Sequence, residues 1–322
     1  MSDVIALGEI LIDFTSFGVS DEGNPIFEQN PGGAPANVLA CLSKLGHSTS
    51  FIGKVGQDQF GIFLEKVLNE TGISTKGLVK TDKAGTTLAF VHLDDKGERS
   101  FSFNRNPGAD LLLEPDEINK QIIDECKIFH FGSVSLTGQP SRTATLEAAG
   151  YAKKQDKIIS YDPNLRLMLW SSAEKAKKEI LNAMPFADIV KVSEEELIFL
   201  SGTYDMNLAA KQLLKQYSLK LLIVTLGENG AITCNENGVA SMPGYIVNSV
   251  DTTGAGDAFT GAFLYKLLES GKIPENLLVA EMEDFLMFAN AAGALTTTKR
   301  GAIYAMPEMN EIMSLIVKDK LK

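Results

Sequence analysis

The stretch DTTGAGDAF, residues 251–259, carries the strongest signal for the fold in this 322-residue chain. It follows the strand-like residues 245–250 and precedes a run with apolar side chains at helical spacing, so we expect a strand-to-helix junction. Gly254, Ala255 and Gly256 have no bulky side chain, which lets a ligand approach the backbone closely. Because the first N–H groups of a helix have no partner within it, the junction predicts an anion site.

Asp257 stands in the first turn of the expected helix, beside this anion site. An acid there can simply complement the helix dipole. A carboxylate next to bound phosphate is nevertheless repelled unless it has a chemical task, and taking a proton from an attacking hydroxyl is such a task. A dinucleotide fingerprint would need glycine at Phe259, and the P-loop pattern fails at residues 53–55 and 271–273. Neither of these phosphate motifs therefore describes the chain.

Strands and helices alternate on both sides of this junction. We expect strands at residues 4–7, 50–52, 86–93, 100–103, 128–131, 158–161, 189–192, 221–225 and 231–234. We expect helices near residues 35–45, 60–68, 140–154, 173–183, 194–200, 207–217, 257–270 and 281–295. The alternation predicts an α/β fold with a mostly parallel sheet covered on both faces. A hairpin with its turn at residues 94–97 interrupts the pattern and predicts a small separate flap.

The composition is that of an ordinary globular protein, with 44% hydrophobic residues and a formal net charge of −11. This acidic balance argues against nucleic acid and anionic membrane as partners, and no apolar run reaches the roughly 20 residues of a membrane helix. Cys41, Cys126 and Cys234 are far apart, which predicts reduced, buried side chains in a cytoplasmic protein. The three histidines are equally scattered and show no metal-ligand spacing.

Residues 251–257 resemble the D-T-x-G-A-G-D signature of the ribokinase-like (phosphofructokinase-B type) sugar kinases. Residues 32–37 and 53–61 are similar to the N-terminal signature of the same family, and the motifs occur in the family's order. The resemblance implies a single domain over residues 1–322: a three-layer α/β/α sandwich with a small β-sheet lid from about residues 10–31 and 84–107. Within the family, the segments most similar to fructokinases are residues 8–13, 103–110 and 161–166.

The resemblance also implies the reaction. The expected activity is ATP-dependent phosphorylation of a sugar's primary hydroxyl, with D-fructose converted to D-fructose 6-phosphate. Asp257 would be the base, and the N–H groups of Gly254, Ala255 and Gly256 would hold the charge of the transferring phosphate. ATP, Mg²⁺ and K⁺ are the expected cofactors.

The sugar site implied by the family draws on residues from several segments. Most of them also have an ordinary reading, such as a strand-end acid, a helix-entry turn or a surface arginine. By similarity, the sugar contacts are Asp13, Gly32, Gly33, Asn37, Phe103, Arg105 and Arg166. The glycine pair would act as a hinge for the lid, and Arg105 would reach from the lid into the site.

The ATP and metal sites follow from the same resemblance. The implied ATP-binding residues are Lys191, Glu196, Thr225, Gly227, Gly230 and Asn290. Asp251 and Thr253, with backbone from residues 297–301, resemble the family's potassium site. Glu196 would act on Mg²⁺ through water, because Mg²⁺ keeps several of its waters. Ser193 replaces the asparagine of the family's N-x-x-E motif, and the sequence does not decide which of residues 194–196 acts on magnesium.

Other functions stay open at this point. 2-Keto-3-deoxygluconate kinase and ribokinase are the alternatives within the family. A non-catalytic sugar-binding sensor is disfavoured because Asp257 and the glycine turn are intact, and a nucleotide-binding oxidoreductase is disfavoured by the missing fingerprint. The exposed edge of the flap could pair between subunits, so a homodimer is a plausible assembly.

Overall fold

Strand β1, Val4–Leu7, is a run of four apolar residues that are fully buried. In the computed structural model, which describes residues 2–93 and 99–320, β1 lies inside a sheet and pairs in parallel with β4 and β8. Within these residues the sheet contains, in spatial order, β13 (Gly238–Met242), β12 (Ala231–Asn235), β11 (Leu221–Thr225), β10 (Ile189–Ser193), β9 (Ile158–Asp162), β8 (Ile128–Gly132), β1, β4 (Thr49–Gly56) and β5 (Ile73–Thr81). The antiparallel pairs in this described sheet are β11–β12 and β12–β13, and the other pairs are parallel.

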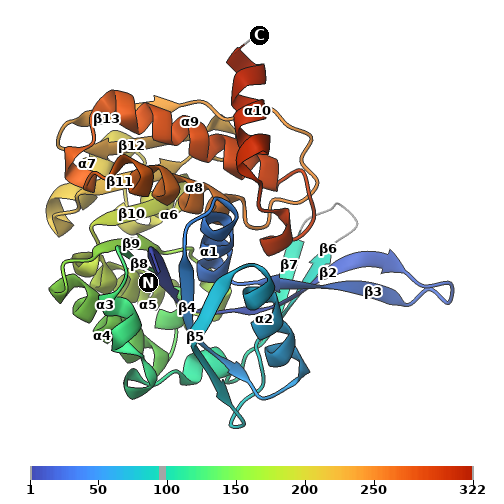
Figure 1. Ribbon diagram of the computed structural model, residues 1–322. Helices are drawn as coiled ribbons and strands as arrows, with labels where there is room; N and C mark the ends of the chain where they lie inside the picture. Colours follow the sequence, from blue (N-terminus) through green and yellow to red (C-terminus); the bar gives the residue numbers. More distant parts are fainter. Residues whose placement is uncertain (1, 94–98, 321–322) are drawn as a thin grey trace.

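Helices cover both faces of this sheet and complete the three-layer α/β/α sandwich (Figure 1). One layer contains α1 (Ala34–Lys44), α2 (Gln59–Glu70), α8 (Ala255–Ser270), α9 (Val279–Thr296) and α10 (Met309–Lys320). The other contains α3 (Lys120–Asp124), α4 (Ser141–Lys154), α5 (Ala173–Ala183), α6 (Glu194–Ser201) and α7 (Met206–Tyr217). No helix in the described ranges is both long and apolar enough to span a membrane.

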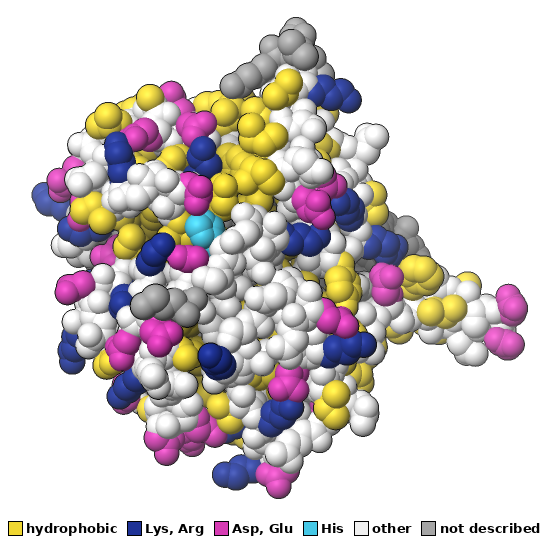
Figure 2. Space-filling model, viewed as in Figure 1, with side chains coloured by type: hydrophobic (Ala, Val, Ile, Leu, Met, Phe, Trp, Pro, Cys, Tyr) yellow, Lys and Arg dark blue, Asp and Glu magenta, His cyan; other side chains and the backbone are white. Residues whose placement is uncertain are grey.

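A second, smaller sheet stands beside the sandwich. Its order is β3 (Pro25–Gly32), β2 (Leu11–Val19), β6 (Leu88–Leu93) and β7 (Arg99–Asn104). The far part of the β2–β3 hairpin projects from the body of the molecule, and the space-filling view shows the same arm (Figures 1 and 2). These strands occupy the two stretches that the sequence assigned to a flap. The turn expected at residues 94–97 lies outside the described residues.

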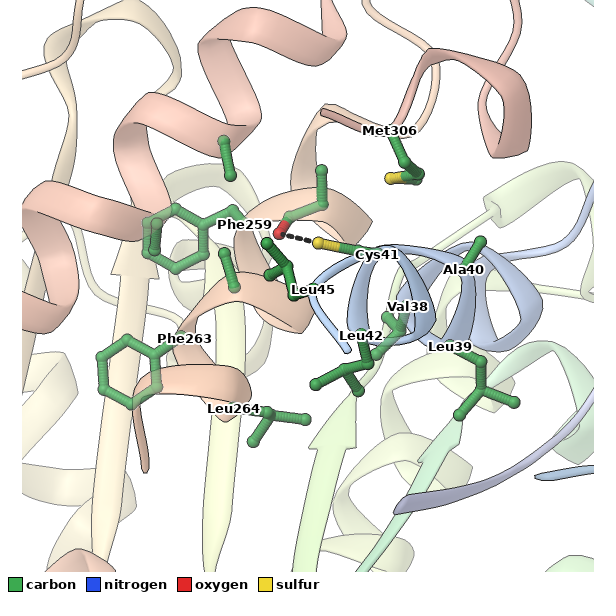
Figure 3. Packing of buried hydrophobic residues seen from close by; sticks show 14 of the residues in the cluster. Val38, Leu39, Ala40, Cys41, Leu42, Leu45, Phe259, Phe263, Leu264 and Met306 are labelled. Carbon is green, nitrogen blue, oxygen red and sulfur yellow. Dashed lines mark hydrogen bonds between the residues drawn. The ribbon is translucent and has the colours of Figure 1, made fainter. Parts of the chain in front are cut away.

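Helices α1 and α8 pack closely, and Figure 3 shows the apolar side chains around their contact. The thiol of Cys41 donates to the backbone oxygen of Ala258 at 3.4 Å. A Cβ added at Gly261 would lie 2.7 Å from Cβ of Cys41, so glycine permits this close approach. Because Asn37 and Asp257 lie one turn before this contact on their helices, the packing brings their side chains together.

The prediction of a strand over residues 245–250 is wrong. The strand nearest this position is β13, which ends at Met242 and pairs antiparallel with β12. Ile246 is 98% exposed, so the apolar side chains of the segment do not form the buried run that their sequence indicates. The N–H of Val250 donates to the carbonyl of Thr297 at 2.7 Å, and the segment thereby joins a loop instead of a sheet.

Candidate active site

A cavity of about 490 Å³ opens at the carboxyl ends of the central strands, beside the small sheet. Parallel sheets bind ligands at this edge. The lining residues are Glu9, Leu11, Asp13, Thr15, Gly33, Ala34, Asn37, Val91, Phe103, Val134, Asn164, Arg166, Leu169, Lys191, Thr252, Thr253, Gly254, Gly256 and Asp257. A hollow of similar volume, about 510 Å³, lies at the opposite edge around Lys153 and Asp188. It contains none of the predicted site residues, so the first cavity is the candidate site.

Asp257 lies in the first turn of α8 and is 7% exposed. Its Oδ2 accepts a hydrogen bond from Nδ2 of Asn37 at 2.8 Å, and its Oδ1 accepts one from Nδ2 of Asn164 at 3.3 Å. Burial, assisted by the negative charge of Asp162, raises the pKa of Asp257 to about 6, although the Asn37 hydrogen bond and two nearby cations oppose the shift. A carboxyl group with this pKa is ionised at neutral pH and can still accept a proton, as a general base must.

The glycine turn that precedes Asp257 has the geometry expected of an anion site. Gly254 adopts φ 80, and a Cβ there would lie 2.8 Å from Cβ of Ala302, so the position requires glycine. Helix α8 begins its own hydrogen bonds with the N–H of Ala258, which donates to the carbonyl of Gly254 at 2.8 Å. The N–H groups of Gly256 and Asp257 stand before that bond, at the positive end of the helix dipole.

A buried cation lies next to this turn. Nζ of Lys191, on β10, is 3.1 Å from Oδ2 of Asp162, and a Cβ built on Gly256 would also lie 3.1 Å from this Nζ. Burial disfavours the charged amine, but Asp162, Glu196 and Asp257 together outweigh it and raise the pKa of Lys191. The ammonium group therefore stays charged beside the backbone that would meet a phosphate.

Asp13 is the second acid of the cavity, at its small-sheet end. Burial raises the pKa of Asp13 to about 7; the positive charge of Arg166 opposes the shift, and the acids Asp251 and Asp257 add to it. Gly32 and Gly33 fit closely around the start of β2. A Cβ at Gly32 would meet Oδ2 of Asp13 at 2.1 Å, and one at Gly33 would meet the backbone oxygen of Glu9 at 2.4 Å. The glycine pair thus allows the chain to pass directly beside Asp13.

Arg105 lies behind the cavity and is not one of its lining residues. Its guanidinium donates to Oδ2 of Asp110 through Nε at 2.8 Å and through one terminal nitrogen at 2.5 Å. The guanidinium also donates to the hydroxyl of Thr137 and the carbonyl of Val134. With its side chain 4% exposed, Arg105 forms a buried ion pair in this conformation. The sugar contact expected of Arg105 stays a prediction, and the structure assigns the residue these other partners.

Asp251 ties the turn before α8 to the loop after α9. Its Oδ1 accepts from the N–H and the hydroxyl of Thr253 at 3.0 and 2.7 Å, and its Oδ2 accepts from the N–H of Gly301 at 3.1 Å. The two segments predicted to share a potassium ion therefore lie side by side. Among the described residues, no group of three or more His, Cys, Asp or Glu side chains has the arrangement of a metal site.

The remaining predicted ATP residues lie outside the lining of this cavity. Glu196 closes a capping box with Ser193 at the start of α6 and accepts from the N–H of Leu165 at 2.5 Å. Thr225 ends β11, and Gly227 and Gly230 form the turn into β12. Asn290, on α9, donates to the carbonyls of Met242 and Pro243. These two residues lie beside the turn, next to Gly230. These residues lie around the ends of β10, β11 and β13.

Sequence reasoning did not select three acidic or amide side chains of the site: Glu9, Asp162 and Asn164. Each stands at or just after the carboxyl end of a strand of the main sheet, the edge where parallel sheets bind ligands, and this position is the signal that could have selected them. Asp13, which was selected by similarity, is instead the third residue of β2. Asn164 carries an additional signal, because its backbone adopts φ 47 and asparagine is one of the few residues that accept this conformation readily. The three cysteines are free and buried, as expected.

Comparisons with known proteins agree with this geometry. The profile described as "pfkB family carbohydrate kinase" matches residues 1–309. The chain is 46% identical over 315 residues to a protein named probable fructokinase-4 from Arabidopsis thaliana, covering 97% of this chain and 96% of that protein. The crystal structure of a fructokinase with bound ATP from Xylella fastidiosa superimposes with a TM-score of 0.91 at 36% identity, covering 99% and 100% of the two chains.

A further similar crystal structure contains both a sugar and a nucleotide. It is a fructokinase double mutant from Vibrio cholerae O395 in its fructose, ADP and potassium ion bound form. The TM-score to this chain is 0.87 at 34% identity, and the alignment covers 98% of each chain.

Proposed function

This chain belongs to the pfkB family of carbohydrate kinases, and we propose that it transfers the terminal phosphoryl group of ATP to the primary hydroxyl of fructose, giving fructose 6-phosphate. The observation that carries this proposal is the placement of Asp257. Its buried carboxyl group, with a pKa of about 6, lies in the first turn of α8, directly after the glycine turn and inside a cavity large enough for a sugar.

The proposed chemistry uses positions already held by the fold. Asp257 takes the proton from the sugar hydroxyl as that oxygen attacks the phosphorus. The N–H groups of Gly254 and Gly256 and the ammonium of Lys191 stabilise the negative charge on the transferring group. The N–H of Ala255, which was also expected to contribute, donates to the carbonyl of Thr252 at 3.3 Å in this conformation. Since these groups are fixed before the substrates bind, little reorganisation is needed during the reaction.

The proposal includes two metal ions, Mg²⁺ and K⁺, both of which prefer oxygen ligands. Both carboxylate oxygens of Glu196 accept backbone N–H groups, from Leu165 and Ser193, so this side chain fits a role through water better than direct ligation of Mg²⁺. When bound, Mg²⁺ neutralises phosphate charge. Asp251 and Thr253 present oxygen atoms next to the 297–301 loop, which suits K⁺.

The charge of the sugar end favours a neutral sugar. Two acids, Glu9 and Asp13, line the small-sheet end of the cavity. The cations in the lining of the described cavity are Arg166 and Lys191. The guanidinium of Arg105 is already paired with Asp110. A sugar acid such as 2-keto-3-deoxygluconate would bring a third carboxyl group to this end, at an electrostatic cost. Among neutral sugars, the names of the similar proteins favour fructose over ribose.

We assign the small sheet the role of a lid that closes on the sugar, with Gly32 and Gly33 as its hinge. Closure would keep water away from the phosphoryl group and limit wasteful hydrolysis of ATP.

The small sheet also suits a homodimer, because β3 is an edge strand and Phe17, Val19 and Ile26 on the β2–β3 hairpin are 58%, 68% and 41% exposed. Sedimentation equilibrium on the wild type and on Val19→Lys tests this assembly. The cytoplasmic location expected from the sequence stays a prediction.

A substrate panel tests the proposal. ADP formation would be followed with fructose, ribose, glucose, 2-keto-3-deoxygluconate and a nucleoside as acceptors, each at varied concentration with ATP and Mg²⁺. We expect the highest kcat/KM with fructose and little ADP formation without a sugar. A higher kcat/KM for the sugar acid or for ribose would overturn the fructose assignment, and binding of sugars without any ADP formation would favour the sensor.

A further inference from the structure

Helix α1 has no capping side chain of its own. Gly33 occupies its N-cap position, and its first turn contains no acidic residue. The N–H of Ala34 instead donates to Oε1 of Glu9 at 3.1 Å, and Glu9 lies in the junction between β1 and β2, 25 residues earlier. A carboxyl group from another element thus takes the place that serine, threonine or aspartate usually fills in the helix sequence.

Glu9 is buried, with 3% of its surface exposed. Its Oε2 has no hydrogen-bond partner among the described residues. Burial raises the pKa of Glu9 to about 7. Keeping an acid in such a place costs free energy, because one carboxyl oxygen loses its contacts with water and gains none in return. The bond that Oε1 accepts from Ala34 offsets part of this cost.

The bond between Glu9 and Ala34 lies within one helical turn of Asn37, the residue that contacts Asp257. Asn37 is three residues after Ala34, and its N–H donates to the carbonyl of Gly33 at 2.9 Å, so both residues belong to the first turn of α1. The side chain of Asn37 then holds Oδ2 of Asp257 at 2.8 Å. Gly33, with φ 118, is a permissive residue directly before this turn. If the bond to Ala34 is lost, the turn can unwind from its glycine end and carry Asn37 away from Asp257.

We propose that Glu9 is a positioning residue for phosphoryl transfer, which caps α1 from outside that helix and thereby keeps Asn37 bonded to Asp257. The proposal rests on the proposed role of Asp257 as the base. Glu9 lines the same cavity, but the route proposed for its effect on Asp257 passes through Ala34 and Asn37.

Three variants separate this role from a general loss of stability. Glu9→Ala removes the cap, whereas Glu9→Gln keeps an oxygen that can accept from Ala34. Asp205→Ala is the matched control, because Asp205 caps α7 through the N–H of Leu208 and lies outside the cavity lining. We expect Glu9→Ala to lower kcat by about 10-fold or more with little change in the KM for ATP. Glu9→Gln should recover most of the kcat that Glu9→Ala loses, and Asp205→Ala should stay within about 3-fold of the wild type.

A double-mutant cycle tests the route through Asn37. If Glu9 acts by placing Asn37, Asn37→Ala should cost much less kcat in the Glu9→Ala background than in the wild type. Losses that multiply in full would contradict the route. A wild-type kcat in Glu9→Ala, or an equal loss in Glu9→Gln, would contradict the role itself.

Amide hydrogen exchange provides a readout that needs no sugar. Residues 34–37 should exchange faster in Glu9→Ala than in the wild type or in Asp205→Ala. Unchanged exchange would overturn the capping role, even if the wild type phosphorylates fructose. Conversely, failure of the wild type to phosphorylate any sugar would remove the proposed function and leave the exchange result to decide whether Glu9 caps α1.

Discussion

The pKa of Asp257 sets the acid side of the pH profile. Because burial raises this pKa to about 6 in the ligand-free protein, we expect kcat/KM for fructose to fall as the pH drops through about 6, where the base becomes protonated. Asn37→Ala removes a hydrogen bond that lowers this pKa, so its acid limb should move to higher pH. The measurement is kcat/KM for fructose from about pH 3.5 to 9 at saturating ATP. An acid limb near pH 4, the range of an ordinary carboxyl group, would contradict the assignment.

Arg105 offers a second prediction at the scale of one residue. Arg105→Ala leaves Asp110 buried without its cation, and breaking a buried pair in this way costs about 3–5 kcal/mol. We expect a clear fall in the urea midpoint, and Arg105→Lys should recover part of it. Unfolding equal to that of the wild type, together with a raised KM for fructose, would instead support the sugar contact that the resemblance implies.

At the scale of elements, the turn before α8 depends on its neighbour after α9. If K⁺ binds where Asp251, Thr253 and the 297–301 loop meet, it should hold the glycine turn in the geometry that stabilises the phosphoryl group. We expect kcat to rise when K⁺ replaces tetramethylammonium at constant ionic strength, and Asp251→Asn should weaken this response. Equal rates with the two cations would remove potassium from the site.

The sequence predicts most elements because their signals are local. Helix α5 was expected at residues 173–183 and is observed at Ala173–Ala183, where Ser172 caps it. Strand β5 was not expected, since Ile73–Thr81 mixes polar and apolar residues at the sheet edge. The apolar residues 245–250 show the opposite failure. Their exposure is decided by tertiary contacts, namely the edge position taken by β13 and the bond from Val250 to Thr297, which no local pattern reports.

The candidate site was predictable in part for the same reason. Asp257, Gly254 and Asp13 stand in sequence motifs, and the structure brings all three to one cavity. The partners that tune them come from distant segments. Asn37 reaches Asp257 across 220 residues, and the pairing of Arg105 with Asp110 depends on side-chain direction. Neither contact follows from spacing along the chain.

For the whole molecule, the acids of the cavity oppose stability at high pH. The pKa of Asp13 is raised to about 7 in the folded protein, above its value of about 4 when unfolded. The stability that this group contributes is therefore complete below about pH 4 and is lost as the pH rises through 7. Asparagine cannot ionise, so Asp13→Asn should have a higher Tm than the wild type at pH 8 and nearly the same Tm at pH 4.5. Calorimetry without ligands checks this, and a lower Tm at pH 8 would contradict it.

The same substitution should weaken the binding of fructose, because asparagine offers one acceptor where the carboxylate offers two. A gain in stability with a loss of binding is the trade expected at a functional site. Titration calorimetry with fructose measures the second half of this prediction. Unchanged affinity in Asp13→Asn would place the sugar elsewhere.

Phosphorus NMR of the product tests the central claim most directly, because it identifies both the acceptor and the position of the new bond. The protein would be mixed with ATP, Mg²⁺, K⁺ and fructose, and Asp257→Asn would be run beside it. We predict a single sugar phosphate, fructose 6-phosphate, formed at about 10²–10⁴-fold lower rate in the variant. Phosphate on another hydroxyl, free phosphate as the main product, or equal rates in the two proteins would contradict the account.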